Sequence, residues 1–293
     1  MKGISKMRAI VYGETIWDIY PEEKVNGGAA FNYAAHLAPL GAETYFISAV
    51  GNDDLGDEAL SEAKRHGIMT DFIVKNSKKT GACIVTLDGE GIPVFDVISD
   101  TAYDNIELDR ECVERLAELK ADVFYFNTLC QRGNVSRNTL RTLLDCVSFP
   151  NTVCDINIRK DCYDSDSLSL CMEKCSLVKI SDEEGHVLYD FGLIGSGSGD
   201  FLRDVADAYP NIRYIAYTLG SRGSRVLDTA EGKTCDSGIP EKVDVVSTVG
   251  AGDCYCASLT YEIYFRKHNL ADSVSFATER CLKVVSRREA VPF

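Results

Sequence analysis

The chain has 293 residues, of which 45% are hydrophobic and 26% are charged, a balance typical of one large α/β domain or two small ones. Its 31 basic and 45 acidic residues give a formal net charge of −14, which argues against binding to a nucleic-acid backbone or to an anionic membrane. A phosphate ligand is not excluded, because the backbone N–H groups at a helix start bind anions whatever the net charge is.

Twelve cysteines are present, and none of them forms a C-x-x-C pair. Several lie in apolar stretches, Cys83 and Cys154 among them, where a free cysteine behaves as a small core residue. We therefore expect structural thiols rather than a zinc site. Because the sequence has no apolar run long enough to cross a bilayer and residues 1–7 resemble no signal peptide, we expect a reducing, cytoplasmic compartment.

Strand-like and helix-like segments alternate in chain order. The apolar and β-branched runs predict strands at residues 8–12, 44–50, 122–126, 152–156, 177–180 and 212–217. Helical spacing predicts helices at residues 31–40, 55–66, 106–119, 136–146, 168–175, 182–189 and 201–209. This alternation predicts a mainly parallel sheet with helices on both faces.

Two segments depart from the alternation. Residues 82–87 and 93–98 flank the turn sequence Asp-Gly-Glu-Gly at 88–91 and predict a hairpin. Residues 15–20 form a second candidate strand, and we place both in a small β lid made of segments 14–26 and 81–100. The Gly/Ser run at 195–199 has no following lysine, so we interpret it as a link between helices rather than a phosphate loop.

The sequence Ser-Thr-Val-Gly-Ala-Gly-Asp at 247–253 lies between an extended stretch and a helix-like stretch at 254–265. Its glycines allow consecutive N–H groups to face one concave space, and the helix dipole adds partial positive charge there. Asp253 follows directly. Such a site suits phosphoryl transfer, with the carboxylate accepting the proton of the acceptor. The alternative is a helix start at which Asp253 merely favours the dipole.

A second group of polar residues precedes the first predicted helix. Gly27 and Gly28 allow a ligand to approach the backbone, and Asn32 offers a donor and an acceptor. Glu14 and Asp18 follow the first predicted strand. Carboxylates and an amide that converge on one place are what a polyhydroxylated ligand requires. The alternative is a glycine turn followed by an asparagine cap.

These residues resemble the PfkB, or ribokinase-like, carbohydrate kinases, and within them the fructokinase branch. The resemblance extends from about residue 8 to residue 292. Residues 27–41 resemble the N-terminal signature of the family and residues 249–253 its C-terminal signature. Between them lie four further motifs in the expected order: Thr-Gly at 80–81, Asp-Ile-Asn-Ile-Arg at 155–159, Lys-Ile-Ser-Asp-Glu-Glu at 179–184, and Thr-Leu-Gly-Ser-Arg-Gly at 218–223.

The resemblance implies a three-layer α/β/α sandwich with a mainly parallel central sheet and a small β-sheet lid, all in one domain at 1–293. It implies an ATP-dependent sugar kinase that uses Mg²⁺. Fructose is the favoured acceptor, and ribose, 2-keto-3-deoxygluconate and nucleosides are alternatives. The resemblance implies that Asp253 is the catalytic base, and that the anion hole is formed by Gly250, Ala251 and Gly252. It implies sugar binding by Asp18, Gly27, Gly28, Asn32, Asn157 and Arg159. Nucleotide binding falls to Thr218, Gly220 and Gly223, and Glu184 would order the water shell of Mg²⁺.

Two departures from the family pattern lie at the edge of this site. Ser247 replaces an aspartate that helps hold a monovalent cation in some relatives, so the sequence does not support K⁺ activation. Glu289 stands where a glycine is usual. Family members often dimerise through the lid, and we expect the same here. A catalytically idle sugar sensor is a second hypothesis, although Asp253 and the glycines are retained. A dinucleotide-binding dehydrogenase would need a glycine fingerprint after the first strand, where residues 13–18 read Gly-Glu-Thr-Ile-Trp-Asp.

Overall fold

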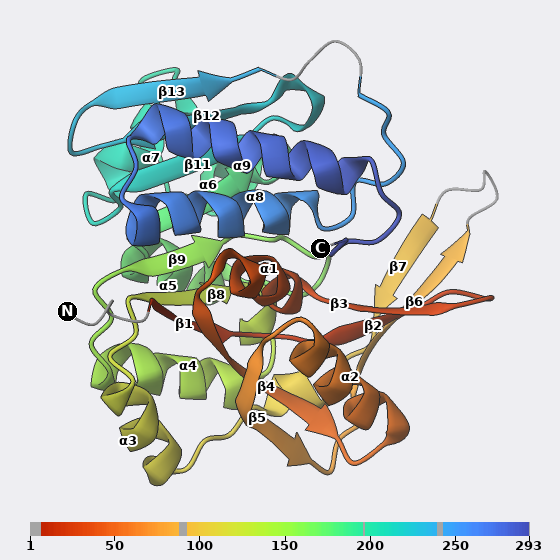
Figure 1. The fold of residues 1–293 in the computed structure, drawn as a ribbon. Helices are drawn as coiled ribbons and strands as arrows, with labels where there is room; N and C mark the ends of the chain where they lie inside the picture. The colour runs from red at the N-terminus through yellow and green to blue at the C-terminus, as the bar shows by residue number, and fades with distance from the viewer. Residues whose placement is uncertain (1–6, 88–92, 196, 239–242, 293) are drawn as a thin grey trace, which may run out of the picture.

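The computed structural model describes residues 7–87, 93–195, 197–238 and 243–292, and a large twisted sheet forms its centre (Figure 1). Within the described residues this sheet has nine strands. From one edge to the other they are β13 (Lys233–Ser237), β12 (Ser224–Asp228), β11 (Tyr214–Thr218), β10 (Leu177–Ser181), β9 (Thr152–Asp155), β8 (Val123–Asn127), β1 (Arg8–Tyr12), β4 (Glu43–Gly51) and β5 (Met69–Asn76). All neighbours from β11 to β5 pair in parallel, whereas β12 and β13 are antiparallel.

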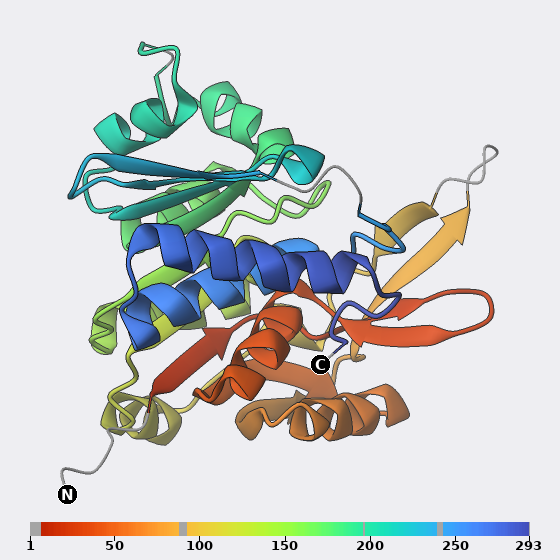
Figure 2. The same ribbon diagram turned by 45° about the horizontal axis from the view of Figure 1, so that its top comes forward.

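Helices cover both faces of this sheet, as Figure 2 shows. On one face lie α1 (Ala29–Leu37), α8 (Ala251–Thr260) and α9 (Leu270–Val285), with α2 (Asp54–Arg65) beside them. On the other face lie α3 (Arg110–Glu118), α4 (Asn134–Cys146), α5 (Ser165–Lys174), α6 (Asp182–Asp190) and α7 (Phe201–Ala208). Alternate residues of β1 divide between the two cores, with Ala9 and Val11 in one and Ile10 and Tyr12 in the other, as expected of a strand buried on both faces. The three-layer prediction is confirmed.

A separate small sheet projects beside α2 (Figure 1). Its strand order is β3 (Lys24–Gly27), β2 (Ile16–Ile19), β6 (Gly81–Leu87) and β7 (Pro93–Val97). The two predicted segments pair with each other through the parallel contact of β2 with β6, while β6 and β7 form the predicted antiparallel hairpin. The turn predicted at 88–91 lies outside the described residues.

Several predicted boundaries were wrong for local reasons. The helix predicted at 106–119 begins only at Arg110, because the carboxylate of Asp109 caps it by accepting a hydrogen bond of 2.8 Å from the N–H of Cys112. The helix predicted at 254–265 begins at Ala251, which places Asp253 in its first turn, and after Thr260 it continues as a π-helix (Tyr261–Arg266). The sequence reading also missed β3, β5, β12, β13 and α9. No described helix is long and apolar enough to cross a membrane.

Candidate functional site

The parallel strands at the centre of the large sheet all have their carboxyl ends on the same side of the sheet, and polar residues lie at or just after these strand ends. Glu14 comes after β1, Asn127 ends β8, Asp155 ends β9, Ser181 ends β10 and Thr218 ends β11. In open α/β sheets, ligands bind outside the carboxyl ends of the strands. The predicted site residues that follow these strands therefore lie at the edge where a ligand is expected.

The first turn of α8 brings the glycines and Asp253 to this edge. Gly250 precedes α8 with φ of 77°, in the left-handed region. A Cβ on Gly250 would lie 2.6 Å from the carbonyl oxygen of Ala290, so a larger residue would require the backbone to move. The first N–H groups of a helix have no partner within the helix. The N–H of Ala251 donates instead to the carbonyl of Thr248 at 3.2 Å. The other N–H groups of this helix start can donate to an anion while the helix dipole favours negative charge.

The carboxylate of Asp253 is held by a residue that is distant in sequence. The Nδ2 of Asn32 donates a hydrogen bond of 2.8 Å to Oδ2 of Asp253, across 221 positions. Burial raises the pKa of Asp253 to about 6, although the hydrogen bond from Asn32 and the charges of Lys179 and Arg159 act to lower it. The two signatures predicted from sequence thus meet at one carboxylate, whose pKa suits a general base near neutral pH.

Oxygen atoms of Asp18 and Asn32 approach one point beside Gly27. A Cβ on Gly27 would lie 3.7 Å from Oδ2 of Asp18 and 3.8 Å from Oδ1 of Asn32. Within the described part of the chain, Oδ1 of Asn32 is buried without a hydrogen-bond partner, which is unusual unless a ligand or water supplies one. Burial also raises the pKa of Asp18 to about 6, against the lowering effect of Arg159. Two hydroxyl groups of a ligand could donate to these two oxygens.

Glu14 lies fully buried behind this space, and the sequence did not identify its partner. The Nδ2 of Asn127 donates to both of its carboxylate oxygens, at 3.1 and 3.0 Å, and the N–H of Ala30 donates at 3.2 Å. Burial nevertheless raises the pKa of Glu14. Gly28 packs closely on the same residue, because a Cβ there would lie 2.9 Å from the carbonyl oxygen of Glu14. An asparagine at the end of a fully buried strand was the available signal for Asn127.

Three ionisable residues form a buried cluster below α8. The Nζ of Lys179 lies 3.0 Å from Oδ1 of Asp155 and 3.8 Å from Oε2 of Glu184. Burial raises the pKa of Asp155 to about 7, although Lys179 lowers it. The two oxygens of Glu184 also accept backbone hydrogen bonds, from the N–H of Ser181 at 2.8 Å and from the N–H of Ile158 at 2.9 Å. Glu184 is therefore fixed in place, with its remaining lone pairs available to water.

Arg159 and Asn157 follow β9. The exposed guanidinium of Arg159 donates to the carbonyl of Ile158 at 3.0 Å, and its charge lowers the pKa of Glu14, Asp18 and Asp253. It therefore lies close enough to influence all three carboxylates. Asn157 is buried and has φ of 42°, a left-handed conformation that asparagine tolerates better than most residues do.

The predicted nucleotide residues follow β11, next to β10. Thr218 ends the strand, Gly220 begins a short 3₁₀ turn (Gly220–Arg222), and Gly223 has φ of 92°. A Cβ on Gly223 would lie 1.9 Å from the carbonyl oxygen of Ser237, so only glycine fits there. The hydroxyls of Ser224 and Tyr255 lie 2.6 Å apart and connect this turn to α8.

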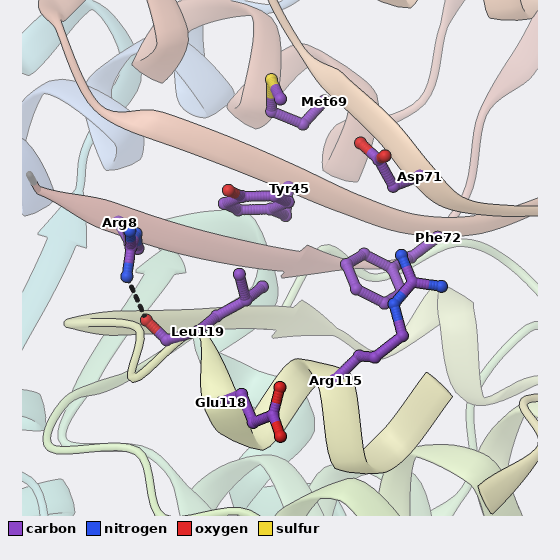
Figure 3. Close-up of a pocket in the computed structure, with 8 residues that line it drawn as sticks. All are labelled: Arg8, Tyr45, Met69, Asp71, Phe72, Arg115, Glu118 and Leu119. Carbon is purple, nitrogen blue, oxygen red and sulfur yellow. Dashed lines mark hydrogen bonds between the residues drawn. The ribbon is translucent and has the colours of Figure 1, made fainter. Parts of the chain in front are cut away.

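A pocket of about 430 Å³ lies elsewhere, between β5 and the end of α3 (Figure 3). Its eight lining residues, all in the described part of the chain, include Arg8, whose guanidinium donates to the carbonyl of Leu119 at 2.8 Å. No predicted site residue is among them. The pocket lies at the amino ends of β1 and β5, away from the edge described above.

Comparison with known proteins finds relatives in both sequence and fold. A putative sugar kinase from Pyrococcus horikoshii is 29% identical over 250 residues, which cover 83% of this chain and 74% of that protein. The structure of an uncharacterized sugar kinase from P. horikoshii in complex with ATP has a TM-score of 0.80 at 26% identity, covering 97% of this chain and 94% of the other. A fructokinase from Vibrio cholerae O395, in its fructose, ADP and calcium ion bound form, also has a TM-score of 0.80, at 21% identity, covering 99% of this chain and 96% of the other.

The family itself follows from a match over nearly the whole length. The model of the pfkB family carbohydrate kinases matches residues 7–291. The large, mainly parallel sheet with its small separate sheet is the ribokinase-like arrangement of these structural neighbours. The chain belongs to the pfkB family of carbohydrate kinases.

Proposed function

We propose that this protein transfers the γ-phosphate of ATP to a hydroxyl group of a monosaccharide, with fructose as the first candidate. The observation that carries the proposal is the position of Asp253, in the first turn of α8 and hydrogen-bonded by Asn32. Its pKa of about 6 leaves it ionised at neutral pH yet basic enough to take a proton.

In the proposed reaction, Asp253 accepts the proton of the sugar hydroxyl as the hydroxyl oxygen attacks the γ-phosphorus. The bond from the γ-phosphorus to the bridging oxygen breaks, and ADP leaves with the electron pair. The N–H groups at the start of α8, those of Gly250 and Gly252 first, would stabilise the charge on the transferring group, while the N–H of Ala251 donates to the carbonyl of Thr248. Because these donors belong to a packed helix, they need no reorganisation during the reaction.

Sugar recognition is assigned to the space beside Gly27. Asp18 and Asn32 supply oxygens for ligand hydroxyls, and Gly28 allows the ligand to approach the backbone. Arg159 is proposed to approach the acceptor or the transferring phosphate, since its guanidinium matches oxygen anions well. The motif at 155–159 favours fructose, and the fructokinase from V. cholerae, which is similar in fold, was crystallised with that sugar.

Nucleotide binding is assigned to the turn after β11, with Thr218, Gly220 and Gly223. An ATP complex of the P. horikoshii sugar kinase, which is 26% identical, supports ATP as the donor. Mg²⁺, where bound, would neutralise charge on the ATP phosphates, and Glu184 would order its water shell. The carboxylate of Glu184 suits this hard cation, and its backbone hydrogen bonds keep it oriented.

The proposal is tested by measuring ADP production with ATP, Mg²⁺ and a panel of sugars and nucleosides. Asp253→Asn should reduce kcat on the accepted substrate on the order of 10²- to 10⁴-fold, because it removes the base. Asp272→Asn is the matched control, since Asp272 occupies the equivalent third position of α9. That control should retain the wild-type kcat.

Each outcome of this experiment has a definite meaning. Turnover on one sugar that collapses only in Asp253→Asn would identify the acceptor and the base together. Turnover on a different sugar or on a nucleoside would correct the choice of fructose. Sugar binding by calorimetry without any turnover would contradict the kinase proposal and favour the sensor hypothesis.

A further inference from the structure

Lys179 is a buried cation that has no role in the mechanism proposed above. Its side chain is only 9% exposed, and Asp155 beside it is only 1% exposed. Burying an ammonium group is costly unless opposite charges and hydrogen bonds compensate it. Asp155 at 3.0 Å and Glu184 at 3.8 Å supply that compensation. They also fix the ammonium at one point in the structure.

That point lies directly against the proposed anion hole. A Cβ on Gly252 would lie 3.3 Å from Nζ of Lys179 and 3.6 Å from its Cε. The ammonium therefore packs against the first turn of α8, where the helix dipole is already positive. The charge of Lys179 also reaches Asp253 in this same turn, because it lowers the pKa of that carboxyl. A negatively charged group bound at the helix start would be attracted by the ammonium and by the helix dipole together.

We propose that Lys179 is a positioning residue for phosphoryl transfer: its fixed positive charge supports the N–H groups of Gly252 and its neighbours in holding the γ-phosphoryl group. The proposal rests on the proposed function. Asp155, at the end of β9, and Glu184, in the first turn of α6, hold the ammonium in place. Lys179 does not touch the substrate but acts through the helix start, where its charge adds to that of the dipole.

The alternative is that Lys179 only neutralises Asp155 and Glu184. To separate the two roles, we would compare Lys179→Met with the double variant Lys179→Met/Asp155→Asn. The single variant leaves a buried carboxylate without its cation and should lower the unfolding temperature. The double variant removes the ion pair as a unit, so it should recover most of that stability. The same exchange at an exposed pair, Lys174→Met/Asp145→Asn, is the control, because those side chains lie 3.1 Å apart on the surface.

Two measurements on the double variant decide the question. We expect kcat on the accepted sugar to fall on the order of 10- to 100-fold while the KM for that sugar stays the same, because the lost charge acts on the transferring group. We also expect the affinity for β,γ-imido-ATP relative to ADP, both with Mg²⁺, to fall by at least about 5-fold, since in the proposed reaction it is the γ-phosphoryl group that lies at the helix start. The control should change neither value.

A stable double variant with wild-type kcat and an unchanged ratio of affinities would overturn the proposal and leave Lys179 a purely structural role. If the double variant is unstable, the ratio of nucleotide affinities is measured on Lys179→Gln, which keeps a polar group beside Asp155. An unchanged ratio there would overturn the proposal equally. The affinity ratio needs no sugar, so it remains decisive even if the wild-type protein phosphorylates none of the sugars tested.

Discussion

At the scale of single residues, burial and hydrogen bonding act in opposite directions on Asp253. Burial raises its pKa, and the donated hydrogen bond from Asn32 favours the charged form and lowers it. The net value of about 6 predicts that kcat/KM falls as the pH drops through that region, because a protonated Asp253 cannot accept a proton. A profile of kcat/KM between pH 5 and pH 8 measures this fall, the acidic limb of the profile, directly.

Replacing Asn32 with alanine should move that limb to higher pH. Without the donor, the charged form of Asp253 loses its hydrogen bond, so its pKa rises further. Asn151→Ala is the control, since the amide of Asn151 donates to the carbonyl of Asp122 rather than to a carboxylate. A limb that stays in place in Asn32→Ala would show that this hydrogen bond does not govern the base. Because Asn32 is also proposed to bind the sugar, KM should change in this variant, but a change in KM alone would not shift the acidic limb along the pH axis.

From the sequence, candidate site residues could be named, but the contacts between them could not. Asp253 and Asn32 stand out as candidates because glycines and predicted helix starts surround them. The contact of Asn127 with Glu14 could not, because it depends on β8 lying next to β1, with 113 positions between the two residues. The pairing of Lys179 with Asp155 likewise depends on β10 lying beside β9.

At the scale of elements, the start of α8 depends on the conformation of Gly250. Two effects oppose any side chain there: φ of 77° and the carbonyl of Ala290, which would lie 2.6 Å from a Cβ. Gly232, in the turn between β12 and β13, allows the two effects to be measured separately. Its φ is 62°, but nothing lies within 4 Å of a Cβ placed on it. Gly232→Ala should therefore show the conformational cost alone.

We expect Gly232→Ala to lower the free energy of unfolding by roughly 1–2 kcal/mol. Gly250→Ala should cost roughly 1–3 kcal/mol more, because the helix start must shift away from Ala290. It should also lower kcat sharply, whereas Gly232→Ala should not. Urea unfolding and steady-state kinetics on both variants measure these effects. Equal losses of stability would show that the contact with Ala290 relaxes without cost.

Two of the strands that the sequence missed, β13 and β5, share a physical cause. β13 is the edge strand of the large sheet, and its sequence Lys-Thr-Cys-Asp-Ser is mostly exposed. β5, at the other edge, is also only partly buried. Such strands carry no continuous apolar run, since only one side of them packs against the core. The interior strands from β11 to β4 were predicted from their hydrophobic pattern, whereas β12, which is interior but fully buried only at alternate positions, was missed.

At the scale of the whole molecule, the small sheet must be held in place for Asp18 to lie near Asn32, beside Gly27. Asp53 provides one such connection. Its carboxylate caps α2 by accepting from the N–H of Gly56 at 2.9 Å, and it also accepts from the N–H of Thr80 at 3.0 Å and from the Thr80 hydroxyl. Thr80 is buried and directly precedes β6. The carboxylate of Asp53 thus connects α2, which packs beside the large sheet, to the small sheet.

Asp53→Ala should therefore affect both stability and substrate binding, whereas Asp109→Ala, which removes only the cap of α3, should affect stability alone. Loss of the contacts to buried Thr80 should add roughly 1–3 kcal/mol to the cost of removing the Asp53 cap. We also expect the KM for the sugar to rise severalfold in Asp53→Ala, because the small sheet carries Asp18. An unchanged KM would mean that other contacts suffice to place this sheet.

The pH dependence of stability offers an independent check on the same carboxylate. Burial acts to raise the pKa of Asp53, but the hydrogen bonds from Thr80 and from the N–H of Gly56 outweigh it and hold the pKa below the ordinary value of 3.8. A carboxyl whose pKa is lower in the folded state stabilises the protein above its unfolded pKa, and that contribution is lost as the pH falls through the folded value. The difference in unfolding free energy between wild type and Asp53→Ala should thus be constant near neutral pH and shrink below about pH 4. A difference that grew on acidification would mean that the carboxylate is not held by these donors, and the connection between α2 and the small sheet would need another explanation.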